Sequence, residues 1–192
     1  MSNKVTFGFR NVHVAFRTDD ATPTWGTPIK VPGAVRFTPT TAGEDSTFYA
    51  DDGPYFVVTT NEGYTAEIEM ADIPDAVMKE MLGWVTDDNG MLVEDADAQP
   101  KNFALMGEIQ GDDKNRRFVY YNCIAQRPNR EHATKADTTT PVTNVMSMTI
   151  MPVTLGSGAG ARRVVKGDMQ LSESNTVQYN AFFDAVYEPV FT

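Results

Sequence analysis

Apolar and polar residues alternate along several stretches of this chain, and this period restricts its fold more than any other feature. In the clearest stretch, residues 64–70, four apolar residues interleave with three polar ones: Tyr64, Ala66, Ile68 and Met70 with Thr65, Glu67 and Glu69. Because successive side chains of a strand point to opposite faces, this pattern predicts a strand with an apolar inner face and an acidic outer face. Residues 5–16 also alternate, and a change of phase near Arg10 and Asn11 predicts a bulge.

Similar stretches occur along the rest of the chain, so we expect a mainly β fold. The further predicted strands are short pieces within 29–37, then 55–60, 102–109, 116–125, 142–153 and 162–169. Each of 55–60 and 102–109 is expected to form a hairpin with the strand that follows it. A chain of 192 residues is long enough for one buried core, which favours a single domain over residues 1–192.

One helix is predicted among these strands, at residues 73–82. Asp72 can cap it, Pro74 suits its first turn, and Gly83 can end it. The helix is too short to be stable alone, so it is expected to dock on the sheet. A second short helix is predicted at residues 175–186.

Two long polar segments, residues 39–54 and 127–141, are predicted to be flexible loops. Loops longer than about 12 residues are uncommon in compact domains and are often functional. The first segment also contains Phe48 and Tyr49, and aromatic side chains in a mobile loop favour contact with a partner.

The formal net charge of −10 comes from one segment of the chain. Residues 62–97 contain eleven acidic residues and one basic residue, whereas the remainder contains 15 of each. An acidic surface repels the phosphate backbone, so tight binding of nucleic acid is not expected.

The sequence lacks the residue patterns of an enzyme or a metal site. The two histidines, His13 and His132, are far apart, and there is no CxxC or HExxH motif. The single cysteine, Cys123, lies in an apolar run and is expected to be buried in a strand. The adjacent acidic residues Asp51 and Asp52 would point to opposite faces of a strand or face water in a turn. We therefore expect a structural protein without catalytic activity or cofactor.

The N-terminal residues lack the apolar stretch of a signal peptide. No apolar run approaches the roughly 20 residues that span a bilayer. We expect a protein made in a cytoplasm and not inserted into a membrane.

Several short segments carry a resemblance to a known family. They are VTFGFRNVH at 5–13, GTP at 26–28, PGAV at 32–35, FYADD at 48–52, GYTAEIE at 63–69, IPD at 73–75, LG at 82–83, FVYYNC at 118–123 and AQRP at 125–128. Their order and spacing resemble those of the major tail proteins, the tail-tube subunits of long-tailed, non-contractile bacteriophages (siphophages).

The resemblance implies a β-sandwich or partly closed β-barrel with the flanking helix at 73–82. It also implies a virion protein whose hexameric rings stack into the tail tube. The implied partners are further copies of the chain, a tape-measure protein, a tail terminator, and distal tail or baseplate proteins. DNA would pass through the lumen into the host without specific binding, and assembly would take place in the host cytoplasm.

Two sets of residues are candidates for roles in such a tube. The set expected to reach the adjacent ring comprises Glu44, Asp45, Phe48, Tyr49, Asp51 and Asp52. The set expected to face the lumen comprises Thr65, Glu67 and Glu69.

Two other classes of protein remain open. One is another ring-forming virion protein, such as a tail terminator or a head-decoration protein. The other is a carbohydrate-binding β-sandwich, which would expose aromatic residues on a rigid face. Trp25 and Trp84 instead lie beside turns or a helix end, which disfavours the second class.

Overall fold

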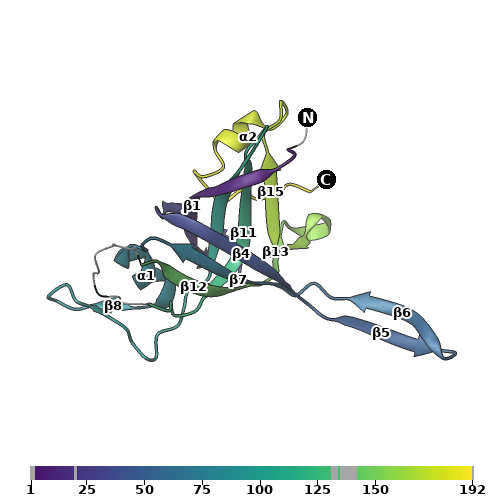
Figure 1. Ribbon diagram of the computed structural model, residues 1–192, viewed down its shortest axis with the longest axis horizontal. Coiled ribbons are helices and arrows are strands. Elements are labelled where there is room, and N and C mark those ends of the chain that lie inside the picture. Colours follow the sequence, from purple (N-terminus) through teal and green to yellow (C-terminus); the bar gives the residue numbers. More distant parts are fainter. Residues whose placement is uncertain (1–2, 20, 131–133, 135–141, 192) are drawn as a thin grey trace.

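Nine strands join in one antiparallel sheet, which confirms the predicted mainly β fold (Figure 1). The structure is a computed structural model that describes residues 3–19, 21–130, 134 and 142–191. Its strands are β1 Thr6–Asp19, β2 Thr24–Trp25, β3 Ile29–Lys30, β4 Ala34–Ala42, β5 Asp45–Ala50, β6 Gly53–Thr59, β7 Gly63–Met70, β8 Val85–Thr86, β9 Leu92–Val93, β10 Phe103–Gly111, β11 Arg116–Ala125, β12 Asn144–Ile150, β13 Val153–Leu155, β14 Arg162–Val164 and β15 Lys166–Gln170. Its helices are α1 Asp75–Leu82, α2 Thr176–Asn180 and a 3-10 turn at Gly158–Gly160.

The main sheet forks at β11. Its strand order is β2-β1-β10-β11-β12-β7-β4, with β3 beside β1 and β15 beside β11. Residues 116–120 of β11 pair with β15, whereas residues 123–125 pair with β12. The strands β12, β7 and β4 therefore leave the plane of β1, β10 and β11 and form a second layer over it (Figure 1). The sheet stays open and does not close into a barrel.

Two hydrophobic clusters lie on opposite faces of the layer formed by β1, β10 and β11. The main core lies between this layer, the β12-β7-β4 layer and α1. The smaller core lies on the other face and is covered by β13 and the C-terminal segment. Alternate residues of β1 enter the two cores, Val14 and Phe16 the main one and Ala15 the smaller one. The central strands are thus buried on both sides, as the apolar run in β11 requires.

Aromatic rings connect the two layers where β4 passes β1 without pairing to it. The Phe37 ring of β4 stacks on Phe118 of β11, with centroids 5.8 Å apart, and on Phe9 of β1, at 6.0 Å. Tyr120 meets Phe37 and Tyr64 edge to face, at 5.4 and 5.6 Å. Stacked and edge-to-face rings are favourable beyond their buried area, so side chains rather than backbone hydrogen bonds hold this flank.

The bulge in β1 and the end of α1 lie where the sequence predicts them. The register of β1 against β10 shifts between Arg10 and His13, and Asn11 has a φ of 54°. Gly83 ends α1 in the left-handed region, with a φ of 72°. The helix begins at Asp75 after Pro74, about two residues later than predicted. Asp72 instead accepts hydrogen bonds from the Ile73 amide and the Asn144 side chain.

The C-terminal helix is shorter than predicted. The predicted helix at 175–186 is reduced to the five residues of α2, in which Val177 is exposed. Tyr179 and Phe182 are the buried side chains of this segment. Phe182 packs in the smaller core, and the Tyr179 ring lies under the Arg117 guanidinium, so the segment is held by its aromatic residues rather than by a helical apolar stripe.

The predicted loop at 39–54 was wrong, because these residues form the end of β4, all of β5 and the start of β6. The predicted hairpin of 55–60 with 64–70 was also wrong, since β6 pairs with β5 and β7 lies between β4 and β12. Asp51 and Asp52 form a two-residue turn, with φ of 49° and 61°. Such turns match the twist of a hairpin, and Asp tolerates them better than most residues. Of the second predicted loop, 131–133 and 135–141 lie outside the described residues.

Glu108 forms a buried ionic network that the sequence did not indicate. Its carboxylate lies 2.7 Å from Nε of Arg10 and 3.0 Å from Nε of Arg117. The Asn115 side chain also donates a hydrogen bond to it. Arg117 in turn donates a hydrogen bond to the Tyr179 carbonyl and lies over the Tyr179 ring. The network therefore ties the C-terminal segment to the central layer.

Replacement Glu108→Leu is expected to lower the free energy of unfolding by about 3 kcal/mol, because it leaves the Arg117 charge in a largely buried site without its partner. Urea unfolding of the unassembled protein measures this loss. The Arg10 side chain is 46% exposed. Arg10→Ala is therefore the control, with an expected loss below about 1 kcal/mol. Equal losses in the two variants would contradict the role assigned to Glu108.

Candidate assembly surfaces

The hairpin formed by β5 and β6 projects far from the body of the molecule (Figure 1). We call residues 43–62, which contain this hairpin and its base, the arm. The base is fixed by reciprocal hydrogen bonds between Glu44 and Thr60. The Glu44 amide donates to the Thr60 hydroxyl at 3.0 Å, and the Thr60 amide donates to the Glu44 carbonyl at 3.1 Å. The arm thus starts from a defined point, although it has no sheet beneath it.

The arm exposes most of its large apolar side chains. Phe48, Tyr49, Tyr55 and Phe56 are each more than 60% exposed, and Val57 and Val58 are exposed as well. Contiguous apolar surface of this kind marks interaction sites in soluble proteins. A two-stranded hairpin without further packing is also only marginally stable in water. The arm is therefore the strongest candidate interface of the described chain.

The predicted inter-ring residues all lie on the arm, at three levels. Glu44 and Asp45 lie at its base, Phe48 and Tyr49 along β5, and Asp51 and Asp52 at its tip. Sequence reasoning missed Phe56, Val57 and Val58, because it paired β6 with β7. The turn at Asp51 and Asp52 was the signal that could have revealed the hairpin.

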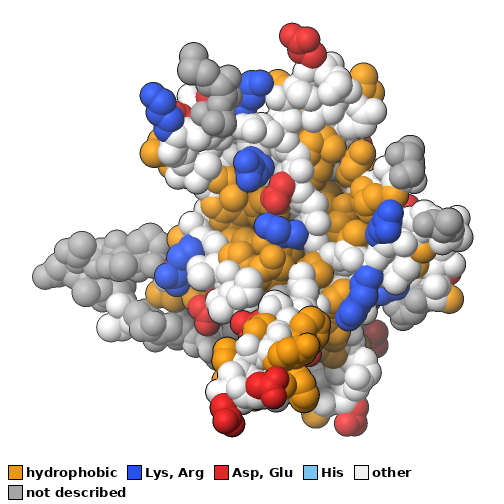
Figure 2. Space-filling model, turned by 90° about the vertical axis from the view of Figure 1, so that its right-hand side faces the viewer, with side chains coloured by type: hydrophobic (Ala, Val, Ile, Leu, Met, Phe, Trp, Pro, Cys, Tyr) orange, Lys and Arg blue, Asp and Glu red, His pale blue; other side chains and the backbone are white. Residues whose placement is uncertain are grey.

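The arm carries negative charge only. Its acidic residues are Glu44, Asp45, Asp51, Asp52 and Glu62, and it contains neither lysine nor arginine. A surface that receives the arm should therefore offer apolar contacts together with cations. Figure 2 views the molecule from the side toward which the arm points, and hydrophobic side chains gather there with lysine and arginine side chains among them.

The second candidate surface is the outward side of β4, β7 and β12, which we call the threonine face. On β7, Ala66, Ile68 and Met70 are buried in the main core, and the alternate residues point away from it, as predicted. The threonine face comprises Thr38, Thr40, Thr65, Glu67, Glu69, Ser147 and Thr149.

The predicted lumen residues Thr65, Glu67 and Glu69 thus lie together on this face, but their surroundings differ. Thr65 and Glu67 are exposed, and Glu67 has no ion-pair partner among the described residues. The Glu69 carboxylate accepts a hydrogen bond from the Thr143 hydroxyl at 2.7 Å and lies 3.4 Å from Nε of Arg36. Its charge is therefore partly compensated, so Glu67 dominates the electrostatics of the face.

The third candidate surface is the free edge of the second layer, which is formed by β4. β4 pairs with β7 along one edge, and its other edge has no strand partner within the described ranges. An unpaired edge presents rows of amide and carbonyl groups that another chain can bind. β4 is therefore a candidate strand for pairing with a neighbouring molecule.

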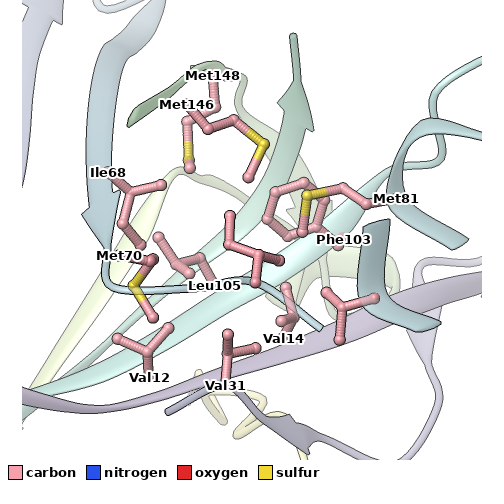
Figure 3. A pocket seen from close by; sticks show the side chains of 12 residues that line it. Val12, Val14, Val31, Ile68, Met70, Met81, Phe103, Leu105, Met146 and Met148 are labelled. Carbon is pink, nitrogen blue, oxygen red and sulfur yellow. The ribbon is translucent and has the colours of Figure 1, made fainter. Parts of the chain in front are cut away.

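The cavity in the main core has no polar site for a ligand among the described residues. An apolar cavity of about 20 Å³ lies in the main core, between β7, β12, α1 and the central layer (Figure 3). Valine, isoleucine, leucine, methionine and phenylalanine side chains line it, among them Met70, Met81 and Met146. A buried water needs two to four polar partners, and this lining offers no polar side chain. The cavity is a packing void.

Neither the cysteine nor a cluster of metal-binding residue types forms a reactive site in the described part of the chain. Cys123 is fully buried as predicted, and burial raises the pKa of its thiol far above the usual range. No cluster of three or more histidine, cysteine or acidic residues there could hold a metal ion. Neither α1 nor α2 has the length and apolar character needed to span a bilayer.

No protein-family model matches the sequence, and no curated protein matches it. The chain is similar to one in the cryo-EM structure of the anti-feeding prophage cap, the tube-terminating cap. The TM-score is 0.50 at 7% identity, over 89% of this chain and 95% of that one. A chain of the PVC sheath-tube complex, an extracellular contractile injection system in its extended state, has a TM-score of 0.48 at 8% identity, over 86% and 94%. A chain of the SPP1 tail tube has 0.40 at 12% identity, over 88% and 81%. The first similarity shows a shared fold and confirms, at that level, the predicted resemblance to tail-tube proteins.

Proposed function

We propose that this chain is a structural subunit of a virion tail tube that assembles with copies of itself. The observation that carries the proposal is the arm, whose apolar side chains nothing in the described part of the chain covers. The shared fold supports it, since the similar protein comes from the cap of a tube.

A contact between the arm and a different surface of another copy is head to tail. Such contacts close into rings when the rotation fits, and they continue as open filaments when it does not. The resemblance to siphophage major tail proteins favours hexameric rings stacked into a tube, with the arm reaching the adjacent ring. A tape-measure protein would occupy the lumen during assembly in the host cytoplasm. A terminator and the distal tail proteins would bind the two ends.

We assign the threonine face to the lumen of this tube. Its hydroxyl groups are uncharged, and Glu67 adds negative charge in every copy. The neighbouring cation on β4, Arg36, is engaged with Glu69. Such a wall repels the phosphate backbone and lets DNA pass into the host without binding it.

A second candidate function is a ring that ends a tube, as a tail terminator does. The similarity to the tube-terminating cap protein specifically favours it. A terminator forms a single ring because one side of the ring lacks a binding surface for the next. The size of the assembly separates the two functions.

Negative-stain electron microscopy of the purified protein at increasing concentration is expected to show tubes of uniform width with an axial hole. Phe48→Ser with Phe56→Ser is expected to remove these tubes, because it deletes apolar contact area on the arm. Val177→Ser, an exposed apolar residue outside the arm, is the control and should leave them intact. Single rings would support the terminator function. A wild-type protein that stays monomeric would contradict both functions.

Cysteine labelling of assembled tubes tests the lumen assignment. In Thr65→Cys, a small maleimide is expected to react, whereas a large polyethylene glycol maleimide should be excluded from an enclosed lumen. Both reagents should react after the tubes are dissociated. Asp88→Cys, in the turn between β8 and β9, is the control and should react with both reagents in the tube. Native Cys123 is buried and adds no background. Equal reaction of Thr65→Cys with the large reagent in tubes would place the threonine face outside.

A further inference from the structure

The arm is apolar on both of its faces. Residues that pair across two antiparallel strands share a face, and neighbours along a strand alternate. Phe48 pairs with Phe56 and Ser46 with Val58, which puts three large apolar residues on one face. Thr47 pairs with Val57, so Val57 lies on the opposite face. The register of the hairpin shifts after Phe48, so that Tyr49 pairs with Pro54 and Tyr55 is the extra residue of β6. Because the extra residue is on β6, alternation along β5 puts Tyr49 with Thr47 on that opposite face.

The exposed fractions show that no described part of the chain covers either face. Phe48 and Phe56 on the first face are 63% and 61% exposed, and Tyr49 and Val57 on the second are 66% and 55% exposed. A ribbon of two strands has no interior, so one flat partner can cover only one of the two faces. Burying all the apolar side chains of the arm requires a surface on each side.

The contact area also favours covering both faces. An aromatic side chain can bury about 150–250 Å², so each exposed ring of the arm offers roughly 100–150 Å². The two rings of the first face then supply roughly 200–300 Å², and the single ring of the second face supplies about half as much. Each face is therefore well below the roughly 800 Å² per partner of a stable interface and can form only part of a larger contact. Covering one face only would leave the rings of the other in water. Covering both would use the full area of the arm.

We infer that the arm is clamped between two other copies of the chain, with one copy against each face. The inference rests on the proposed self-association and specifies its geometry, since three chains meet at every arm. Copies of the same chain also carry charge that is complementary to that of the arm. The arm is entirely acidic, whereas Arg162 and Arg163 of β14 and Lys166 of β15 are exposed cations.

A lipid surface suits the arm less well than protein does. Asp51 and Asp52 at the tip would have to enter the bilayer first, and charged side chains are costly there. The arm also lacks the lysine and arginine residues that anionic leaflets attract. Protein surfaces with apolar and cationic groups are therefore the assigned partners.

Photo-crosslinking in mixed assemblies tests the clamp. The photoreactive residue p-benzoylphenylalanine replaces Phe56 on one face, Tyr49 on the other, or both. Each labelled protein is assembled with a large excess of wild-type chain, so that a labelled copy has only wild-type neighbours. Irradiated assemblies are pelleted and separated on denaturing gels. Either single label should give a two-chain product, and the double label should give a three-chain product.

A double label that yields two-chain products only, in pelleted assemblies, would overturn the clamp and leave the proposed function standing. A wild-type chain that forms no pelletable assembly would overturn both. Crosslinks to phosphatidylcholine vesicles in place of protein would also overturn the clamp. If labels at 49 and 56 prevent assembly, a benzophenone maleimide attached to Ser46→Cys and Thr47→Cys probes the same two faces nearer the base. The same numbers of chains are expected from these positions.

Discussion

Strand β11 is the element on which the rest of the structure depends, because it bonds to three neighbours. Along one edge it pairs with β10, and along the other it pairs first with β15 and then with β12. At the fork, the Tyr121 amide donates to the Val165 carbonyl, and the Asn122 carbonyl accepts from the Met151 amide. One branch extends the central layer, and the other forms the layer that folds over it. This branching of the sheet at β11 creates the main core between the two layers, the ring contacts of Phe37 and the threonine face.

The main sheet packs around its two cores, whereas the arm lies outside both of them. The arm leaves the sheet after Ala42 and returns at Gly63, so it gains nothing from the core. Its exposed apolar side chains would each contribute about 1–2 kcal/mol if they were buried against another surface. The apolar surface whose burial would still stabilise the protein therefore lies mainly on the arm. An exposed apolar element of this kind suits the self-assembly that we propose for the chain.

The acidic residues of segment 62–97 do not stay together on one surface of the folded chain. Along the sequence it forms one block of charge, but the structure distributes it over the threonine face, α1 and the β8-β9 turn. Several of its carboxylates are paired with cations from outside the segment, as Glu80 is with Lys101 and Glu94 with Arg127. The surface therefore has local negative areas of different character rather than one acidic patch. Among the residues of β7, Glu67 is the one whose charge faces outward without a cation beside it.

The alternation of side chains by itself determined most strands of the main sheet, the buried and exposed sides of β7 and the bulge in β1, and Gly83 determined the end of α1. These features follow from local geometry, in which the period of the backbone decides where each side chain points. The partner of each strand was decided only by the tertiary structure, because backbone hydrogen bonds are the same for every sequence. For this reason β6 was paired with the wrong neighbour, and the arm was predicted as a loop. The Glu108 network likewise brings together residues about 100 positions apart, Arg10 and Glu108, which no local pattern connects.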